Sequence, residues 1–291
     1  YNTDIYCRMY RSVDELLAYA HQTSPKVYRP FIMTEYLHTM GNSGGGLKEY
    51  MEVFESEPVV QGGCIWDWVD QSFREVDAHG KWYWAYGGDY GPENIPSFGN
   101  FCCNGLVNAV REPHPHLKEV KKAYQYIKCT LKDPKNLTIA IKNWYDFTNL
   151  NAYVLKWSIM GDNGKMLAKG EQSIEVAPHA TTEVSLGGVR LPRNIREAYL
   201  NLSWTPKKKS AFIGTDDEVA YDQFVLPANS QYRPTLAKLS EKPEIQIDPK
   251  TGALTSYIYE GQEYLASPVR LSLYRPATDN DNRCLLYTSP S

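Results

Sequence analysis

The sequence contains 291 residues with a formal net charge of −3, and 42% of its residues are hydrophobic. This length suits two or three domains, and the near-neutral charge argues against a nucleic-acid-binding protein, which would need a clustered basic face. No apolar run is long enough to cross a membrane. None of the six cysteines has CxxC spacing, which favours buried thiols over a zinc site or a disulfide framework.

Residues 1–126 alternate between strand-like and helix-like patterns. We predict strands at 5–10, 31–36 and 59–68 and helices at 13–21, 47–55 and 117–126. Ser12 is a suitable N-cap for the first helix, and the apolar run at 31–36 is typical of a strand buried on both faces. Because repeated strand–helix units form parallel sheets, this region predicts the C-terminal part of a (β/α)8 barrel, with strands six to eight present.

Residues 127–227 follow a different pattern, in which apolar and polar residues alternate with a period of two. The strands expected from this alternation are 137–144, 152–159, 181–186 and 197–204. Asp162-Asn163-Gly164-Lys165 is a strong hairpin turn. Recurring strands with short turns predict a β-sandwich.

Residues 228–283 combine a polar linker with the start of a third, β-rich domain. Strands are expected at 244–248, 254–259 and 269–274. Residues 284–291 do not continue this pattern and resemble the translation of a sequencing adaptor, so we expect them to be non-native. We also expect the chain to begin inside a domain, because a strand-like segment follows Tyr1 almost at once.

Glu35 is the first residue that indicates chemistry, because it lies at the end of an apolar strand. Burying a carboxylate there is costly unless it has a partner or a role. On its own, Glu35 fits either a structural ion pair or a catalytic nucleophile, which needs nearby groups that keep it ionised and aimed. Tyr36 and His38 supply polar company.

Two further segments carry side chains suited to a binding site. Trp66 and Trp68 are expected on the same side of a strand, as an apolar wall for a sugar or as core residues. In the segment 101–107, the side-chain oxygen of Asn104 and a backbone carbonyl are suitable ligands for a hard cation. A loop held by Asn and Gly turns is the alternative for that segment.

Five segments together resemble glycoside hydrolase family 2, and within it the β-galactosidases of the lac type. They read E-Y-x-H-x-M-G-N-S, Q-G-G-x-x-W-D-W-V-D-Q, Y-G-G-D-Y-G, F-C-x-N-G-L-V and P-H-P, and begin at Glu35, Gln61, Tyr86, Phe101 and Pro113. Arg275–Asp281 resembles a further motif near the start of the family's last domain. The resemblance implies an immunoglobulin-like sandwich at 127–227 and the start of a β-supersandwich domain after it.

The resemblance also implies roles for individual residues. Glu35 matches the nucleophile, Tyr10 a tyrosine beside it, His38 a histidine that contacts the galactosyl group, and Trp66 the floor of the galactose pocket. Phe101, through its carbonyl, and Asn104 match two ligands of a sodium ion near the sugar.

Other carboxylates receive lesser or no roles from the resemblance. Asp67, Asp70 and Asp89 are expected to fix loops. The general acid/base, the magnesium ligands and a further sodium ligand are expected upstream of these 291 residues.

These observations predict a segment of a retaining exo-β-galactosidase acting on β-galactoside saccharides, without nucleic-acid or membrane partners. The segment alone is expected to be inactive, because the retaining mechanism needs two carboxyl groups. The alternatives are a non-catalytic carbohydrate-binding or scaffolding sandwich protein, or a family-2 β-glucuronidase or β-mannosidase. The sequence does not determine the aglycone. It also leaves open whether the parent protein forms homo-oligomers and whether it lies in the bacterial cytoplasm or periplasm.

Overall fold

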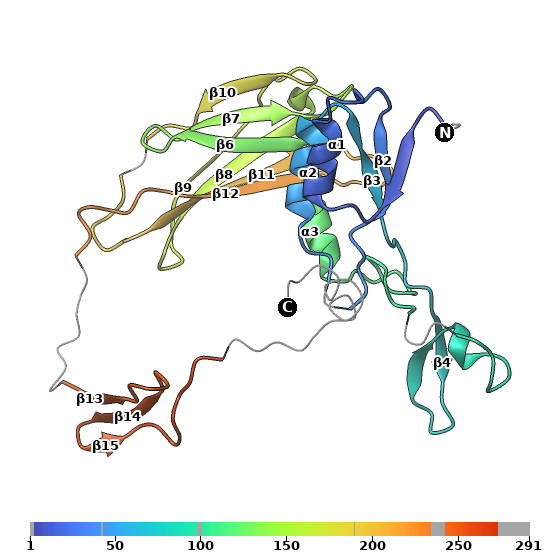
Figure 1. Cartoon of the computed structure of the whole chain (residues 1–291). Coiled ribbons are helices and arrows are strands. Elements are labelled where there is room, and N and C mark those ends of the chain that lie inside the picture. The colour runs from blue at the N-terminus through green and yellow to red at the C-terminus, as the bar shows by residue number, and fades with distance from the viewer. Residues whose placement is uncertain (1–2, 42, 98–100, 189, 234–241, 273–291) are drawn as a thin grey trace.

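The computed structural model describes residues 3–41, 43–97, 101–188, 190–233 and 242–272 (Figure 1). The N-terminal region contains a three-stranded parallel sheet in the order β1-β2-β3, which confirms the predicted parallel arrangement. Its strands are β1 (Tyr6–Met9), β2 (Phe31–Tyr36) and β3 (Val60–Ile65), and its helices are α1 (Val13–Ala20), α2 (Leu47–Ser56) and α3 (His116–Ala123).

Local signals set the helix ends in this region. Ser12 caps α1 as predicted: its hydroxyl accepts a hydrogen bond from the Glu15 backbone, and the Glu15 carboxylate accepts one from Ser12 N–H. Helix α2 follows Gly46, which has a positive φ of 82°, and ends at Ser56, with Glu57 as its C-cap just before Pro58. Buried residues from all three helices, among them Leu16, pack with β2 and β3 in one apolar cluster.

Three expectations for this region were wrong. Strand β2 is not buried on both faces, because Phe31 and Met33 are buried whereas Thr34 is exposed. Strand β3 ends at Ile65, so the two tryptophans that follow lie in a loop rather than on one side of a strand. Between residues 68 and 117, where no strand or helix was predicted, the chain forms an antiparallel hairpin of β4 (Phe73–Val76) and β5 (Trp82–Ala85).

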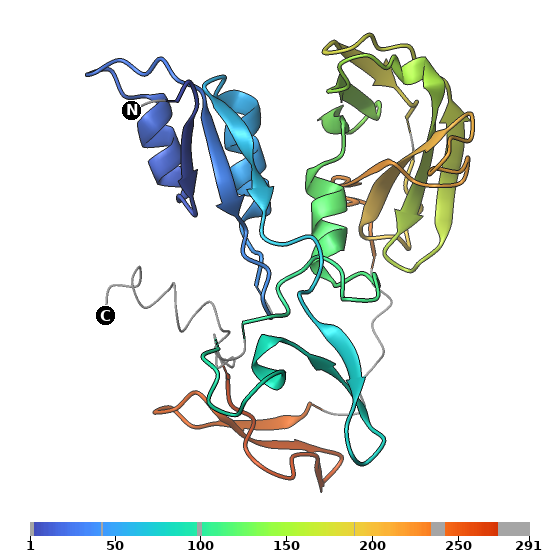
Figure 2. The same cartoon turned by 90° about the vertical axis from the view of Figure 1, so that its right-hand side faces the viewer.

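Residues 127–225 form the predicted β-sandwich, although the strands at 127–133, 166–172 and 220–225 were not among those predicted. Two antiparallel sheets, ordered β10-β7-β6 and β12-β11-β8-β9, face each other (Figures 1 and 2). Their strands are β6 (Ile127–Asp133), β7 (Thr138–Asn143), β8 (Tyr153–Gly161), β9 (Met166–Gln172), β10 (Thr181–Ser185), β11 (Ala198–Pro206) and β12 (Ala220–Val225). Trp204 is fully buried in the core between the sheets, and the predicted hairpin turn at 162–165 joins β8 to β9.

Helix α3 connects the N-terminal region to the sandwich. Lys122 of α3 forms an ion pair of 2.7 Å with Asp222 of β12, and Asp222 also accepts the Cys129 N–H at 3.1 Å. The side chain of Gln125, just beyond α3, accepts a hydrogen bond from Tyr221 N–H at 3.1 Å. These contacts fix one end of the sandwich against the helix that precedes it.

The third region contains a small antiparallel sheet. Its strands are β13 (Glu244–Ile247), β14 (Leu254–Tyr259) and β15 (Gln262–Glu263). The strand predicted at 269–274 is wrong for its described part, where Val269 makes only an isolated bridge to Leu254. The motif at 275–281 and the expected adaptor tail at 284–291 lie outside the described residues.

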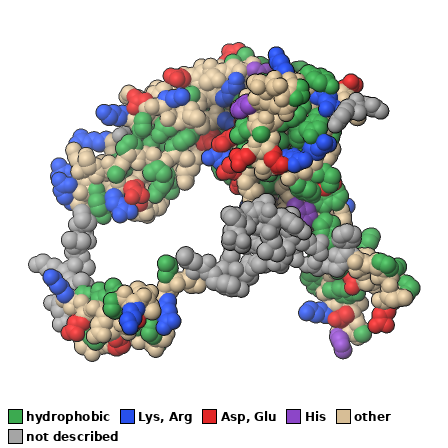
Figure 3. Space-filling model, viewed as in Figure 1, with side chains coloured by type: hydrophobic (Ala, Val, Ile, Leu, Met, Phe, Trp, Pro, Cys, Tyr) green, Lys and Arg blue, Asp and Glu red, His purple; other side chains and the backbone are tan. Residues whose placement is uncertain are grey.

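The distribution of charged side chains on the surface agrees with the near-neutral net charge of the sequence. Figure 3 shows Lys and Arg side chains interspersed with Asp and Glu over the face in view, without one dominant basic patch. Among the described residues, no helix is both long and apolar enough to span a membrane.

Candidate functional site

Glu35 lies near the carboxyl end of β2, which is the central strand of the parallel sheet. Its carbonyl accepts a hydrogen bond of 2.9 Å from Tyr10 N–H, which fixes the end of β1 beside it. The Glu35 side chain is half-buried and makes no hydrogen bond or ion pair within the described part of the chain. A structural ion pair, the alternative for this residue, therefore has no partner there.

Three of the residues expected at the site form a row of rings. The Tyr10 ring meets the His38 ring edge-on, with centroids 6.2 Å apart and an interplanar angle of 86°. The other side of this row is Phe101, whose ring stacks on His38 at 5.3 Å and 12°. The row therefore joins the end of β1, the loop after β2 and the loop that contains Phe101.

Hydrogen bonds to the backbone hold Trp66 and Asn104 beside the loop that contains Thr39. Trp66 N–H donates to the Tyr36 carbonyl at 2.9 Å, and the Trp66 carbonyl accepts from Thr39 N–H at 3.0 Å. Asp67 N–H donates to the Asn104 carbonyl at 2.7 Å, and the Thr39 hydroxyl donates to the same carbonyl. The structure thus gathers all six expected site residues around the loops after β2 and β3.

The side chain of Asn104 is fully buried, yet neither its oxygen nor its nitrogen has a hydrogen-bond partner among the described residues. The indole nitrogen of Trp66 is also buried without a partner in this part of the chain. Leaving a buried polar group unpaired costs about 1–3 kcal/mol, so such groups need an explanation. Two of them in one set of loops indicate a place where a ligand completes the hydrogen bonding.

The loop carboxylates have the positioning role expected of them. Asp70 is only 5% exposed; it accepts the Gly105 N–H at 2.8 Å and contacts the imidazole Nε2 of His114 at 2.8 Å. A Cβ at Gly105 would lie 2.3 Å from the Asp70 nitrogen, so only glycine fits. Asp67 accepts hydrogen bonds from Trp68 N–H and the Gln71 amide.

Sequence reasoning did not assign roles to His114 and Thr39, although both hold the site loops. His114 lies in the P-H-P motif, which could have drawn attention to it. Thr39 donates a hydrogen bond to Asn104, 65 positions away, and no local sequence pattern predicts a contact between residues so far apart.

The five described cysteines are free, as expected, but the expectation that they are buried is only partly right. Cys7 and Cys64 are exposed, whereas Cys102 and Cys129 are buried. Cys102 and Cys103 place their sulfur atoms 3.4 Å apart in the loop that carries Asn104. Burial raises the pKa of the Cys102 thiol to about 12.

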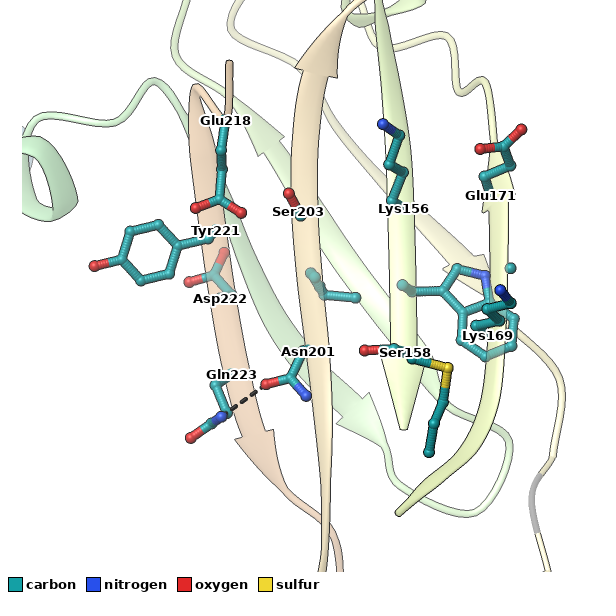
Figure 4. A pocket seen from close by; sticks show the side chains of 14 residues that line it. Lys156, Ser158, Lys169, Glu171, Asn201, Ser203, Glu218, Tyr221, Asp222 and Gln223 are labelled. Atoms are coloured by element: carbon teal, nitrogen blue, oxygen red, sulfur yellow. Dashed lines mark hydrogen bonds between the residues drawn. The ribbon is translucent and has the colours of Figure 1, made fainter. Parts of the chain in front are cut away.

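A hollow lies away from these residues, on the outer face of the sheet β12-β11-β8-β9. It is a groove of ≈ 760 Å³ whose labelled side chains include Lys156, Ser158, Asn201 and Gln223 (Figure 4). None of the expected site residues lines it. Within the described ranges, no group of three His, Cys, Asp or Glu side chains could hold a metal ion.

Comparison with protein-family models gives three matches in chain order. Residues 1–129 match the TIM barrel domain of the glycosyl hydrolases of family 2, residues 139–227 match domain 4 of β-galactosidase, and residues 240–290 match the β-galactosidase small chain. The first match contains every residue that the sequence placed at the site.

Curated relatives extend the same similarity over almost the whole chain. The chain is 38% identical to a β-galactosidase of Priestia megaterium, over 96% of its own length and 28% of the relative's. It is 34% identical to β-galactosidase 2 of Enterobacter cloacae, over 96% of this chain and 29% of that one. The 291 residues therefore span less than a third of the length of these relatives.

Proposed function

Because the chain belongs to glycoside hydrolase family 2, with a barrel segment followed by β domains, we propose that it is part of a retaining exo-β-galactosidase. In this proposal the N-terminal region supplies strands six to eight of a (β/α)8 barrel. The sandwich is immunoglobulin-like, and the third region opens a β-supersandwich domain. The substrate is a saccharide with a terminal β-linked galactose.

Glu35 acts as the nucleophile in this proposal. A retaining glycosidase uses two carboxyl groups roughly 5 Å apart, one to attack the anomeric carbon and one to protonate the leaving oxygen. Attack by Glu35 forms a glycosyl ester, and water then releases galactose while the second carboxyl group takes up a proton. The carboxylate of Glu35 has no ion-pair partner in the described chain, which removes support for the structural alternative there. We assign the acid/base role to no residue of this chain.

The neighbours of Glu35 position the sugar. Tyr10 is linked to Glu35 through the backbone and lies edge-on to His38, so these two side chains can orient the galactosyl group beside the nucleophile. The indole of Trp66 offers a flat apolar surface for the sugar ring and an unpaired N–H for one of its oxygens.

The buried amide of Asn104 fits a role in holding sodium. Its side-chain oxygen lacks a partner among the described residues, and an amide oxygen together with the Phe101 carbonyl is a ligand set that a hard cation prefers. A sodium ion bound there would offer a positive centre to a sugar hydroxyl, and Asn104 itself would also border the sugar. We assign no magnesium ligand to the described residues.

The observation that carries the proposal is the pair of buried, unpartnered polar groups, Asn104 and Trp66, in the loops that follow β3 and flank Glu35. To test it, residues 1–283 would replace the aligned segment of the Priestia megaterium β-galactosidase. This chimaera should hydrolyse an aryl β-galactoside. A 2-deoxy-2-fluoro-galactosyl donor should label it on the peptide that contains Glu35, as read by mass spectrometry.

A matched pair of variants separates the nucleophile from other glutamates. Glu35→Gln should lower turnover by roughly 10⁴-fold or more while sugar binding persists. Glu52→Gln, at an exposed residue of α2 that forms an ion pair with Lys48 at 3.7 Å, should leave turnover unchanged. Retained turnover in Glu35→Gln would refute the assignment. Sugar binding by a chimaera that is inactive even with Glu35 intact would favour the non-catalytic alternative.

The isolated 291-residue chain should not hydrolyse aryl β-galactosides, because we assign it only one of the two carboxyl groups that the mechanism requires. Activity of the purified chain would show that a second carboxyl group of this chain serves as the acid/base.

A further inference from the structure

Cys102 and Cys103 are adjacent in sequence and hold their sulfur atoms 3.4 Å apart. Both thiols are free; Cys102 is 8% exposed and Cys103 is partly exposed, so a small reagent can approach the pair from the Cys103 side. The other described cysteines offer no such pair: Cys7 and Cys64 are exposed, and Cys129 is buried in the sandwich.

The distance between the two sulfur atoms indicates which kind of metal or metalloid atom both of them could bind at once. With bonds to sulfur of about 2.3 Å, as in thiolate–zinc sites, a separation of 3.4 Å gives a near-right angle at the bound centre. A pyramidal three-coordinate centre adopts such an angle, whereas tetrahedral zinc prefers a wider one. Sulfur is a soft ligand, which also favours a soft, thiophilic centre over a hard cation.

We propose that Cys102 and Cys103 form a vicinal dithiol site for trivalent arsenic compounds. The reaction is a condensation: the As=O group of an organoarsenic oxide loses its oxygen as water, and the two thiol protons leave with it. Two As–S bonds replace two S–H bonds, so no oxidant or reductant takes part. The product is a ring that includes both sulfurs and the peptide between them.

The position of the pair links it to the neighbouring site. The Cys102 carbonyl accepts a hydrogen bond of 3.0 Å from Gln71 N–H, and the Asn104 carbonyl accepts one from Asp67 N–H. A ring closed between these two anchored points places the arsenic group in the loop that presents Phe101 and Asn104. Arsenic binding should therefore inhibit the enzyme; this consequence, unlike the dithiol itself, rests on the proposed function.

The dithiol is tested on the 291-residue chain with phenylarsine oxide in the presence of excess monothiol, followed by intact mass measurement. One phenylarsenic group per chain should add, and a dithiol such as dithiothreitol should remove it. Cys103→Ser should lose the adduct, whereas Cys64→Ser, an exposed single cysteine, should keep it. Cys102→Ser should lose the adduct as well. Because Cys102 is buried, this variant can fail to fold, and Cys103→Ser then tests the proposal by itself. No adduct in the unaltered chain, or an adduct that survives in Cys103→Ser, would overturn the proposal.

The link to the site is tested in the chimaera described above. Phenylarsine oxide should abolish hydrolysis by the chimaera with both cysteines, dithiothreitol should restore it, and the Cys103→Ser chimaera should be insensitive. Full activity with the adduct in place would overturn the link. A chimaera without any activity would refute the proposed function and leave the mass measurement as an independent result.

Discussion

Two fully buried asparagines, one in the sandwich and one in the N-terminal region, use their side-chain amides differently. Asn143 of β7 donates to the carbonyls of Thr148 and Val176 at 2.9 and 3.0 Å, and accepts the Tyr145 N–H at 2.9 Å. Asn104 is equally buried, but its amide has no partner in the described chain. A buried amide with all its partners stabilises a fold, whereas one without them indicates a place for something else to bind.

The two regions also differ in how their cores are built. The sandwich buries Trp204 and its neighbours between two sheets of its own. The N-terminal cluster depends on a single three-stranded sheet, in which β1 and β3 are edges within the described residues, and on three short helices. The proposed chemistry thus lies in the region whose single sheet has two open edges within the described residues.

The largest expected effect concerns the satisfied amide. Asn143→Leu should lower the free energy of unfolding of the sandwich by about 2–6 kcal/mol, because the Thr148 carbonyl and the Tyr145 N–H lose their partners at roughly 1–3 kcal/mol each. The Val176 carbonyl keeps the Leu150 N–H as a donor. Hydrogen exchange of peptides from β6 to β12, measured by mass spectrometry in the 291-residue chain, reports this stability locally. A loss smaller than about 1 kcal/mol would mean that water replaces the amide and that the contrast with Asn104 is not real.

The joint between the regions should show the next largest effect. Asp222→Asn weakens the ion pair with Lys122, and since Lys122 is one-third exposed the cost should be about 1–2 kcal/mol. Exchange should rise in peptides of both α3 and β12. A double-mutant cycle with Lys122→Met isolates the coupling of the pair. If only β12 responds, the two regions are independent and the sandwich does not support the site through this contact.

Local signals allowed much of the architecture to be predicted from the sequence. The Ser12–Glu15 capping box and the Asp162–Lys165 turn are made by residues close together in the chain, so their patterns can be read directly. The hairpin β4–β5 was missed because its apolar and polar residues do not alternate. All residues of β4 are exposed, so neither face of the strand requires apolar side chains at every second position.

The site was less predictable from local pattern, because its contacts join distant residues. Thr39 reaches Asn104 across 65 positions, and Tyr36 reaches Tyr124 across 88. Pattern alone left Glu35 undecided between an ion pair and a nucleophile; the family motifs assigned the role. The structure adds what neither supplied, namely that the amide of Asn104 is buried without a partner in the described chain.

Alkaline pH should destabilise the N-terminal region through Tyr36. Burial, and then the 2.5 Å hydrogen bond with Tyr124, raises the pKa of Tyr36 above its ordinary value of 10.0. A raised pKa favours the neutral form, so its stabilisation is complete below pH 10 and is lost as the pH rises further. Each pH unit should cost up to about 1.4 kcal/mol.

The Tyr36→Phe variant should lose about 1 kcal/mol at neutral pH, because it lacks the hydrogen bond, but also lose this part of the alkaline slope. Exchange of β2 peptides between pH 8 and 11 (roughly the range that brackets tyrosine ionisation) measures both effects. Tyr126→Phe, whose ring is 52% exposed, is the control and should keep the slope. An unchanged slope in Tyr36→Phe would assign the alkaline loss to another group.

The smallest expected change in stability is at Asn104, and it is the most informative for the comparison. Asn104→Leu removes an amide that has no partner among the described residues and leaves no partner behind, so stability should change by less than about 1 kcal/mol in either direction. In the chimaera, the same variant should abolish the dependence of aryl β-galactoside hydrolysis on sodium and weaken substrate binding. Asn143→Leu should do the reverse: a large loss of stability, with sodium dependence intact in whatever protein remains folded.

If Asn104→Leu instead destabilises the chain as strongly as Asn143→Leu, then the amide is a structural group whose partners lie outside the described residues, and the proposed sodium ligand must be abandoned. A neutral Asn104→Leu that keeps its sodium dependence would place the ion elsewhere while leaving the buried amide as a ligand for the sugar itself.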